Sequence, residues 1–484
     1  MKSKEFLYLL LLSTGALLVH GYHLGVEDAE IYNAQILKIL HPSLYPFGAE
    51  FFESHAHVTF FPNLVAASVR LMHVPFDYAM FIWHLTTLFL VLLACWKLSG
   101  DLFTEARARW AGVGLVAAIL TLPVAGTSLY IFDQYLNPRS IALFAALFSL
   151  ADALERKWLR VALWTTFAAA IHPLMAVFGL SLVAATLMVG RLDRRARTAA
   201  ACMLPFGISF NYPSEAYRRA IHIRTYFFIL RWEWYEWLGI FGPLLLLWWI
   251  GRLAKKRGLT RVELLCRSLI AFQLVYFLIA LVTTIPPQLL ALVRFQPMRS
   301  LQLVYILLCL MGGGMLGQLV LRDRAWRWLI LFVPLCAGMF YVQRELFPAS
   351  PHVELPGRVP ANAWLQGFAW IRQNTPADAI FAVNPEHMRI PGEDHHGFRA
   401  LAERSMLPDA GKDSGISTMF PNLPIAEHYE EQARAEQGWD HFETTDFERL
   451  HRDWGVTWVV LDRPGVTLPD CPYSNHLLRV CRMN

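Results

Sequence analysis

The stretch Gly21–His57 reads GYHLGVEDAEIYNAQILKILHPSLYPFGAEFFESHAH and follows directly on the first hydrophobic segment of the chain. It is dense in ionisable groups, with acids at Glu27, Asp28, Glu30, Glu50 and Glu53 and histidines at His23, His41, His55 and His57. Residues 27–40 place acids ahead of apolar residues at helical spacing, which predicts one amphipathic helix. So much charge beside an apolar segment makes this acidic loop (residues 21–57) the first candidate for a functional site.

The composition is typical of an integral membrane protein. Of the 484 residues, 55% are hydrophobic and only 17% are charged, and the mean hydropathy is +0.36. Such a balance excludes a single soluble domain. The 17 tryptophans and 16 tyrosines suit belts at two membrane interfaces. The net charge of +5 is modest and gives no reason to expect a nucleic-acid partner.

Eleven apolar segments are predicted to cross the membrane, and many of them approach the ~20 residues that a spanning helix needs. They are Leu7–His20, Tyr78–Leu98, Trp110–Ala125, Ser140–Leu154, Leu159–Ile171, Leu174–Val189, Ala199–Phe210, Leu238–Ile250, Leu264–Thr283, Leu301–Val320 and Leu329–Val342. The segment Val58–Met72 is short and contains Arg70. We expect it to lie beside the membrane or to re-enter it, without crossing.

Charge placement gives the orientation. With eleven crossings, the basic loops alternate with the acidic and polar loops, and the positive-inside rule places the basic set in the cytoplasm. The basic set includes the N-terminus and the loop Arg252–Arg261. The polar loops, among them residues 130–139, 211–237 and 286–299, then gather on the outer side. Polar groups at membrane depth are tolerated mainly where they line a cavity, so we expect one outward-facing chamber. The membrane is expected to be a bacterial inner (cytoplasmic) membrane.

The chain changes character after Val342. Residues 343–360 are rich in proline and predict a linker. Residues 361–484 alternate between helical and strand patterns, which predicts an extracytoplasmic α/β domain. The expected elements are helices at Ala361–Gln373 and Phe447–Asp453 and strands at Ala379–Val383, Val456–Leu461 and Leu477–Val480. Cys471 and Cys481 lie ten residues apart in this domain and are expected to be close enough to pair.

Several short segments resemble the C-type (GT-C) glycosyltransferase superfamily. Val26–Tyr32 is similar to the acidic motif of that family's first external loop. Further segments similar in style are Pro138–Ser140, Ile171–Pro173, Arg294–Arg299, Trp370–Pro376, Phe398–Arg399 and Lys412–Asp413. The resemblance implies a polytopic α-helical membrane protein of about eleven transmembrane helices. Residues 1–342 would form its membrane domain, and the α/β domain would follow at 361–484.

The resemblance also implies an activity, the transfer of a sugar from a polyprenyl-phosphate carrier to a glycan, lipid or protein acceptor at the extracytoplasmic face. Asp28 is the first candidate for the catalytic carboxylate and Glu27 the second, acting as general base or orienting the acceptor. A nearby low-dielectric wall would raise the pKa of such a carboxylate, which suits a base. Arg139, Arg294 and Arg299 are expected to hold the departing phosphate, and His172 and Lys412 complete the expected substrate-binding set.

Each assignment has an alternative. The arginines are also suited to anchoring in lipid headgroups, His172 to bonding a helix end, and Glu30 to capping its own helix. The sequence assigns no cofactor, and the alternative is a divalent metal, for which His55, His57 and Glu53 are suitable residue types. The protein as a whole is alternatively a non-catalytic lipid- or polysaccharide-binding member of a cell-envelope assembly machine, or a transporter. A transporter would show internal repeats, and the sequence has none.

Overall fold

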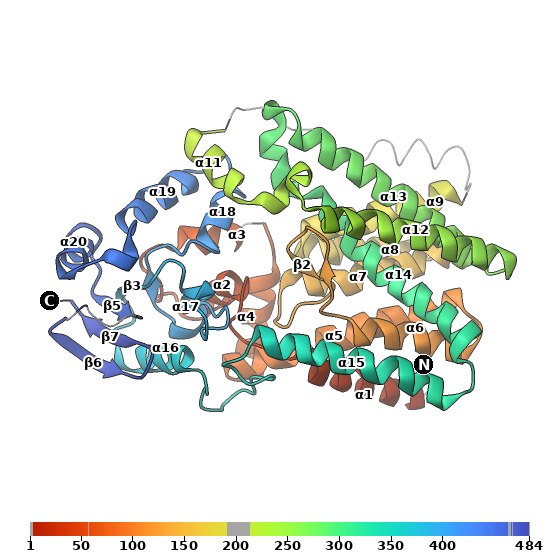
Figure 1. The fold of residues 1–484 in the computed structure, drawn as a ribbon, viewed down its shortest axis with the longest axis horizontal. Helices are drawn as coiled ribbons and strands as arrows, with labels where there is room; N and C mark the ends of the chain where they lie inside the picture. Colours follow the sequence, from red (N-terminus) through yellow and green to blue (C-terminus); the bar gives the residue numbers. More distant parts are fainter. Residues whose placement is uncertain (1–2, 57, 191–212, 463–465, 467, 484) are drawn as a thin grey trace.

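The computed structural model describes residues 3–56, 58–190, 213–462, 466 and 468–483. It has two parts (Figure 1). Long, roughly aligned helices form a helical bundle, and the end of the chain forms a smaller C-terminal part built on a sheet. Helices of the acidic loop lie between the two. The N-terminus lies at the end of the bundle that is farther from the sheet, so the bundle separates the chain's start from its C-terminal part.

The helices of the bundle coincide with the apolar segments of the sequence. They are α1 (Ser3–His20), α5 (Phe76–Leu102), α6 (Ala106–Ala118), α7 (Pro138–Leu154), α8 (Trp158–Ile171), α9 (Pro173–Val189), α12 (Trp234–Lys256), α13 (Thr260–Thr284), α14 (Leu301–Leu316) and α15 (Ala325–Leu346). Shorter connecting helices are α11 (Glu215–Ile223), η1 (Thr225–Phe227), η2 (Ile229–Arg231), η3 (Pro287–Phe295), η4 (Pro297–Ser300) and η5 (Gly317–Leu321). The predicted segment Ala199–Phe210 lies outside the described residues.

Five helical regions of the described chain are long and apolar enough to cross a membrane, which fits a multi-pass membrane protein. They are Phe76–Leu102, Trp234–Lys256, Thr260–Thr284, Pro287–Leu321 and Ala325–Leu346. The helices α8 and α9 are apolar but shorter, so the structure does not confirm eleven crossings. In the acidic loop and just after it lie α2 (Ala29–Leu40), α3 (Glu50–Ala56) and α4 (Phe61–Met72). At ~1.5 Å per residue, α4 is too short to span a ~30 Å hydrocarbon core.

The predicted span Trp110–Ala125 is wrong at its C-terminal end. Helix α6 ends at Ala118, and the chain then forms an antiparallel ribbon of β1 (Pro123–Val124) and β2 (Leu129–Tyr130). Proline has no N–H to continue the helical ladder and clashes with the preceding turn, so Pro123 disfavours a longer helix. The ribbon instead forms part of a cavity wall described below.

The C-terminal part confirms the expected elements and adds others. Its helices are α16 (Ala363–Asn374), η6 (His387–Arg389), α17 (Phe398–Ala402), α18 (Asp413–Ser417), α19 (Ile425–Ala435), η7 (Trp439–His441) and α20 (Thr444–Trp454). Its strands are β3 (Ile380–Ala382), β4 (Ser405–Met406), β5 (Trp458–Leu461), β6 (Asp470–Ser474) and β7 (Arg479–Arg482). The strand order is β4-β3-β5-β7-β6, with β3 parallel to β4 and β5, and β7 antiparallel to β5 and β6.

The core of the C-terminal part follows from side chains that alternate along β5. Trp458 and Val460 face the hydrophobic cluster of α16, whereas Val459 and Leu461 face the cluster of α20. A strand with both faces covered reads as a continuous apolar run, which is why β5 was recognisable in the sequence. Cys471 of β6 and Cys481 of β7 form a disulfide, and this confirms the expected pair.

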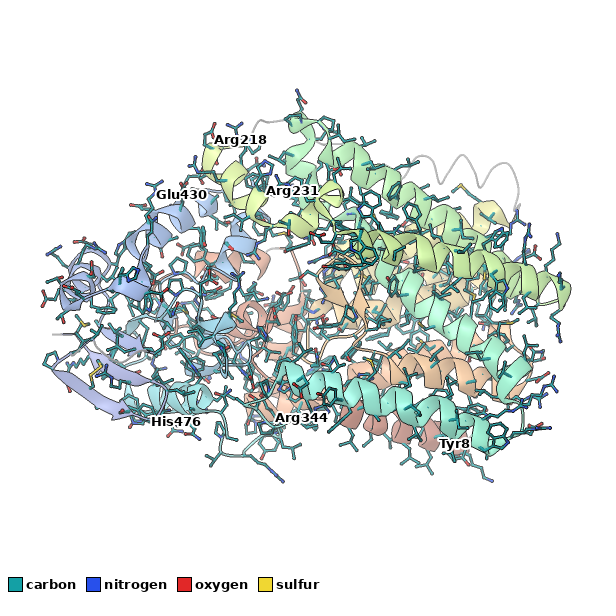
Figure 2. All side chains as sticks on the ribbon, viewed as in Figure 1. Tyr8, Arg218, Arg231, Arg344, Glu430 and His476 are labelled. Atoms are coloured by element: carbon teal, nitrogen blue, oxygen red, sulfur yellow. A yellow bond between two sulfur atoms is a disulfide. The ribbon has the colours of Figure 1, made fainter. Side chains whose placement is uncertain are left out.

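The C-terminal part packs on the acidic loop through Glu30. Its Oε1 accepts a hydrogen bond from the backbone N–H of Arg399 at 2.9 Å, and its Oε2 accepts one from Ala400 at 2.8 Å. Glu30 therefore caps α17, a helix of the C-terminal part, rather than its own helix α2. A second contact joins α11 to α19, where Arg219 Nη2 lies 2.8 Å from Glu430 Oε2; Figure 2 shows Glu430 beside α11.

This packing leaves no room for a side chain at residue 397, which yields a first prediction. A Cβ at Gly397 would lie 2.1 Å from Glu30 Oε2. Gly397→Ala must therefore displace the capping carboxylate, and overpacking of this kind costs about 1–3 kcal/mol. We expect the purified variant to unfold at a lower temperature than the wild type. Gly338→Ala is the control, because nothing lies within 4 Å of a Cβ there; equal midpoints for both variants would contradict the account.

Orientation in the membrane gives a second prediction. Thr104 is exposed in the turn between α5 and α6, and Val359 is 88% exposed in the segment that leads to α16. If the C-terminal part is extracytoplasmic, a membrane-impermeant maleimide should label Val359→Cys in intact cells. Thr104→Cys should be labelled only after the cells are permeabilised. The reverse pattern would invert the topology and remove the basis for an outward-facing chamber.

Candidate active site

A cavity of about 1340 Å³ lies where the helical bundle meets the C-terminal part. Its wall contains all seven residues that the sequence assigned to catalysis or substrate binding. They are Glu27, Asp28, Arg139, His172, Arg294, Arg299 and Lys412. These residues come from the acidic loop, from the N-termini of α7 and α9, from η3 and η4, and from the residue before α18. The fold thus brings together side chains from five separate regions of the sequence.

The two candidate carboxylates share one cation. Lys412 Nζ lies 3.1 Å from Asp28 Oδ1 and also contacts Glu27 Oε2. The backbone at Glu27 is left-handed, with φ 54°, and its N–H donates to the carbonyl of His395 at 2.9 Å. A left-handed non-glycine residue costs on the order of 1–3 kcal/mol and persists only where its surroundings enforce it. The bond to His395, a residue of the C-terminal part, is such an enforcing contact.

The charge environment of Asp28 differs from the expectation. Burial acts to raise the pKa of its carboxyl, but the positive charges of Lys412, Arg139 and Arg299 outweigh burial and hold the pKa below its usual range. The expected rise is therefore wrong, because cations from three distant segments converge on this group. The side chain remains 35% exposed. An ionised, partly accessible carboxylate is suited to accepting a hydrogen bond from a substrate hydroxyl.

Two of the three arginines are already engaged. Arg139 Nη2 lies 2.5 Å from Asp133 Oδ2, and Asp133 also accepts from Asn137 at 2.7 Å. Asn137 in turn caps α7, its Oδ1 accepting from the N–H of Ser140 at 2.8 Å. Arg294 donates to the backbone carbonyl of Met419 at 2.9 Å. These contacts fix the position of Arg139 and join η3 to the C-terminal part.

Arg299 is different. The described residues supply it with no hydrogen-bond acceptor and no ion-pair partner. Its Nε is buried and unpaired, as are those of Arg139 and Arg294, but those two arginines have partners at their terminal nitrogens. It lies in η4 and lines the cavity, where it interacts electrostatically with Arg139 and Asp28. A half-buried guanidinium with open donors beside a second arginine is suited to binding an anion. A phosphate is a natural occupant, since its oxygens match the fork of the guanidinium.

The structure also shows roles that the sequence left open or concealed. His172 is the N-cap of α9, its Nδ1 accepting from the N–H of Met175 at 3.1 Å, so its alternative role as a helix-end partner is confirmed. Arg224 was not predicted; its guanidinium contacts the carbonyl of Gly411 and the hydroxyl of Ser414, next to Lys412.

The metal ligand set of His55, His57 and Glu53 stays a prediction, because His57 lies outside the described residues.

No protein-family model matches the sequence, and no curated protein matches it. The structure is similar to the apo form of the oligosaccharyltransferase of Archaeoglobus fulgidus, with a TM-score of 0.47 and 12% identity over 95% of this chain and 70% of that one. It is also similar to AglB of the same archaeon in complex with an inhibitory peptide and a dolichol-phosphate, with a TM-score of 0.44 and 12% identity over 94% and 69% of the two chains. At these scores the likeness carries no argument about activity.

Proposed function

We propose that the protein is a membrane glycosyltransferase that moves a sugar from a polyprenyl-phosphate carrier to an acceptor at the extracytoplasmic face. One observation carries the proposal. Within a single cavity, the unpartnered guanidinium of Arg299 lies near the ionised carboxylate of Asp28. The first group is suited to an anionic leaving group, and the second to an acceptor hydroxyl. A sugar-phosphate donor and an acceptor need both groups at once.

In the proposed donor site, Arg299 and Arg139 bind the carrier phosphate. The bond from the anomeric carbon to the phosphate oxygen breaks, and its electron pair stays on the phosphate. Fixed cations stabilise this growing negative charge, and such preorganised stabilisation is commonly the largest single contribution to catalysis. Arg139 is held for this task by its contact with Asp133. Arg299 has no partner among the described residues that a phosphate would have to displace before binding.

In the proposed acceptor site, Asp28 accepts a hydrogen bond from the attacking hydroxyl and orients its oxygen toward the anomeric carbon. As the new carbon–oxygen bond forms, the hydroxyl proton passes to Asp28 or Glu27, directly or through one water, and then to solvent. A carboxylate of low pKa takes the proton only late in the step, so positioning is its larger contribution. Lys412 lies between the two acids and supplies positive charge where a divalent cation would otherwise balance them.

The pairing with Lys412 also supports a second candidate, a carrier-binding protein without transferase activity. If Lys412 held Glu27 and Asp28 permanently, the cavity would bind a lipid phosphate through Arg299 and perform no transfer. The two candidates differ in one result: both bind polyprenyl phosphate, but only the transferase forms a glycosylated product.

Substitutions at the two sites give a third prediction. Asp28→Asn keeps the shape of the side chain and removes its charge, so it should lower transfer about 100-fold or more while carrier binding persists. Arg299→Gln should weaken carrier binding as well as transfer. Radiolabelled sugar transfer and binding of a fluorescent polyprenyl phosphate are the two measurements.

The controls for these variants are Asp378→Asn and Arg358→Gln. Both replaced residues are exposed, and neither lines the cavity, so both variants should behave as wild type. Full transfer activity in Asp28→Asn and also in Glu27→Gln would show that neither acid takes part in the reaction.

The lowered pKa of Asp28 gives a fourth prediction, on the pH dependence of transfer. A depressed pKa means that the carboxylate stays ionised as the pH falls, and its contribution is lost only on protonation below the usual aspartate value of about 3.9. We therefore expect kcat to stay nearly constant between about pH 8 and about pH 5. An acid limb centred between about pH 6 and 7 would instead indicate a general base of raised pKa.

A further inference from the structure

A second cluster of ionisable side chains lies where the acidic loop, the segment after α15 and the segment before α17 meet. His23 Nδ1 lies 2.9 Å from Glu354 Oε1, and His396 Nε2 lies 2.7 Å from the same oxygen. His23 and His396 are buried, with 1% and 0% of their side chains exposed. The three ligand-type atoms all lie within 4.8 Å of one another. None of these residues lines the cavity of the proposed transfer reaction.

Each member of the cluster is oriented by a contact on its far side. His396 Nδ1 lies 2.9 Å from the backbone carbonyl of Glu393 and donates to it, so Nε2 is the nitrogen that can bind a metal, once it gives up the proton that it shares with Glu354. Glu354 Oε2 accepts from the N–H of Leu24 at 3.0 Å, which leaves Oε1 toward the histidines. The ring of His23 stacks on Phe347 with centroids 3.9 Å apart. Bonds of this kind from the outer side of a histidine are typical of metal sites.

We propose that His23, Glu354 and His396 bind a divalent metal ion of the zinc class, with a fourth position for a small ligand such as water. Two imidazole nitrogens and one carboxylate oxygen form a common ligand set for this ion. With metal–ligand bonds of about 2.0–2.1 Å, neighbouring ligand atoms of a tetrahedral site lie a little over 3 Å apart. The two histidine nitrogens now lie 2.9 Å and 2.7 Å from Glu354 Oε1, so each must move away from that oxygen by about half an ångström to admit the ion.

The site ties together three segments that are far apart in the sequence, which indicates its purpose. Val26 and His396 form an isolated antiparallel bridge, and Tyr22 and Val353 form a parallel one. A metal at the cluster would fix both bridges, and with them the strained backbone of Glu27 beside the cavity. The ion is thus a clamp between the acidic loop and the C-terminal part, and it takes no part in the transfer step.

The test is the metal content of the purified full-length protein. Wild-type protein, dialysed against metal-free buffer and then loaded with Zn²⁺ alone, should retain about one equivalent by mass spectrometry. His23→Ala and His396→Ala should each lose it. His387→Ala is the matched control, since His387 is also fully buried in the C-terminal part, and among the described residues its ring bonds to one group, the backbone carbonyl of Asn384. Asp28→Asn is the control for a metal in the cavity, and both controls should retain the ion.

Loading with Co²⁺ and thermal unfolding keep the proposal testable if a histidine variant folds poorly. The wild type should show visible d–d absorption of four- or five-coordinate Co²⁺, and Glu354→Gln should lose it. Chelation should lower the unfolding midpoint of the wild type but not that of Glu354→Gln. A wild type that retains no metal would mean that the three side chains form only a hydrogen-bonded ion cluster. Metal that survives the His23 and His396 substitutions, or that Asp28→Asn alone removes, would equally overturn the proposal.

Discussion

The arrangement of the acidic loop, the C-terminal part and the cavity depends on the ion pairs of one buried guanidinium, that of Arg399. A charge taken out of water costs several kcal/mol unless it is fully paired, and removal of one partner costs about 3–5 kcal/mol. Arg399 meets Asp413 at 2.8 Å within the C-terminal part and faces Glu30 of the acidic loop. The buried carboxylate of Glu30 takes its hydrogen bonds from Arg399 and Ala400 of the C-terminal part, so the packing of the two parts fixes the position of the loop. Lys412, next to Asp413 in the chain, is carried by the same network into the cavity.

The cavity's chemistry follows from which charges are satisfied within the protein and which are not. Asp133 pairs with Arg139, the carbonyl of Met419 accepts a hydrogen bond from Arg294, and Lys412 lies between Glu27 and Asp28. Arg299 is left with its donors open among the described residues. A protein seldom keeps a half-buried cation without a partner unless a ligand supplies one. That asymmetry, rather than the number of charged groups, is the reason to assign an anionic substrate to this cavity.

Local patterns in the sequence predicted much of this arrangement, and long-range pairings account for what they missed. Apolar runs located the bundle helices, and the run Val456–Leu461 located the buried strand β5. Membrane topology grouped Asp28, Arg139 and Arg299 on one side, which was enough to predict a shared chamber. No local pattern shows that Glu30 caps a helix 369 residues away, or that His23 meets Glu354 across 331 residues. The direction of the Asp28 pKa was missed for the same reason, because it depends on cations from three distant segments.

The most direct test of the central claim is a density map of the full-length protein in a lipid environment with bound polyprenyl phosphate. The account predicts phosphate density inside the cavity, within hydrogen-bond distance of Arg299 and on the side of Arg139, with the prenyl chain leaving between bundle helices toward the bilayer. Asp28 should remain free of the phosphate and accessible to an acceptor. Phosphate density outside the cavity, or an Arg299 side chain that binds only bilayer headgroups, would contradict the assignment of this cavity as a glycosyl-transfer site.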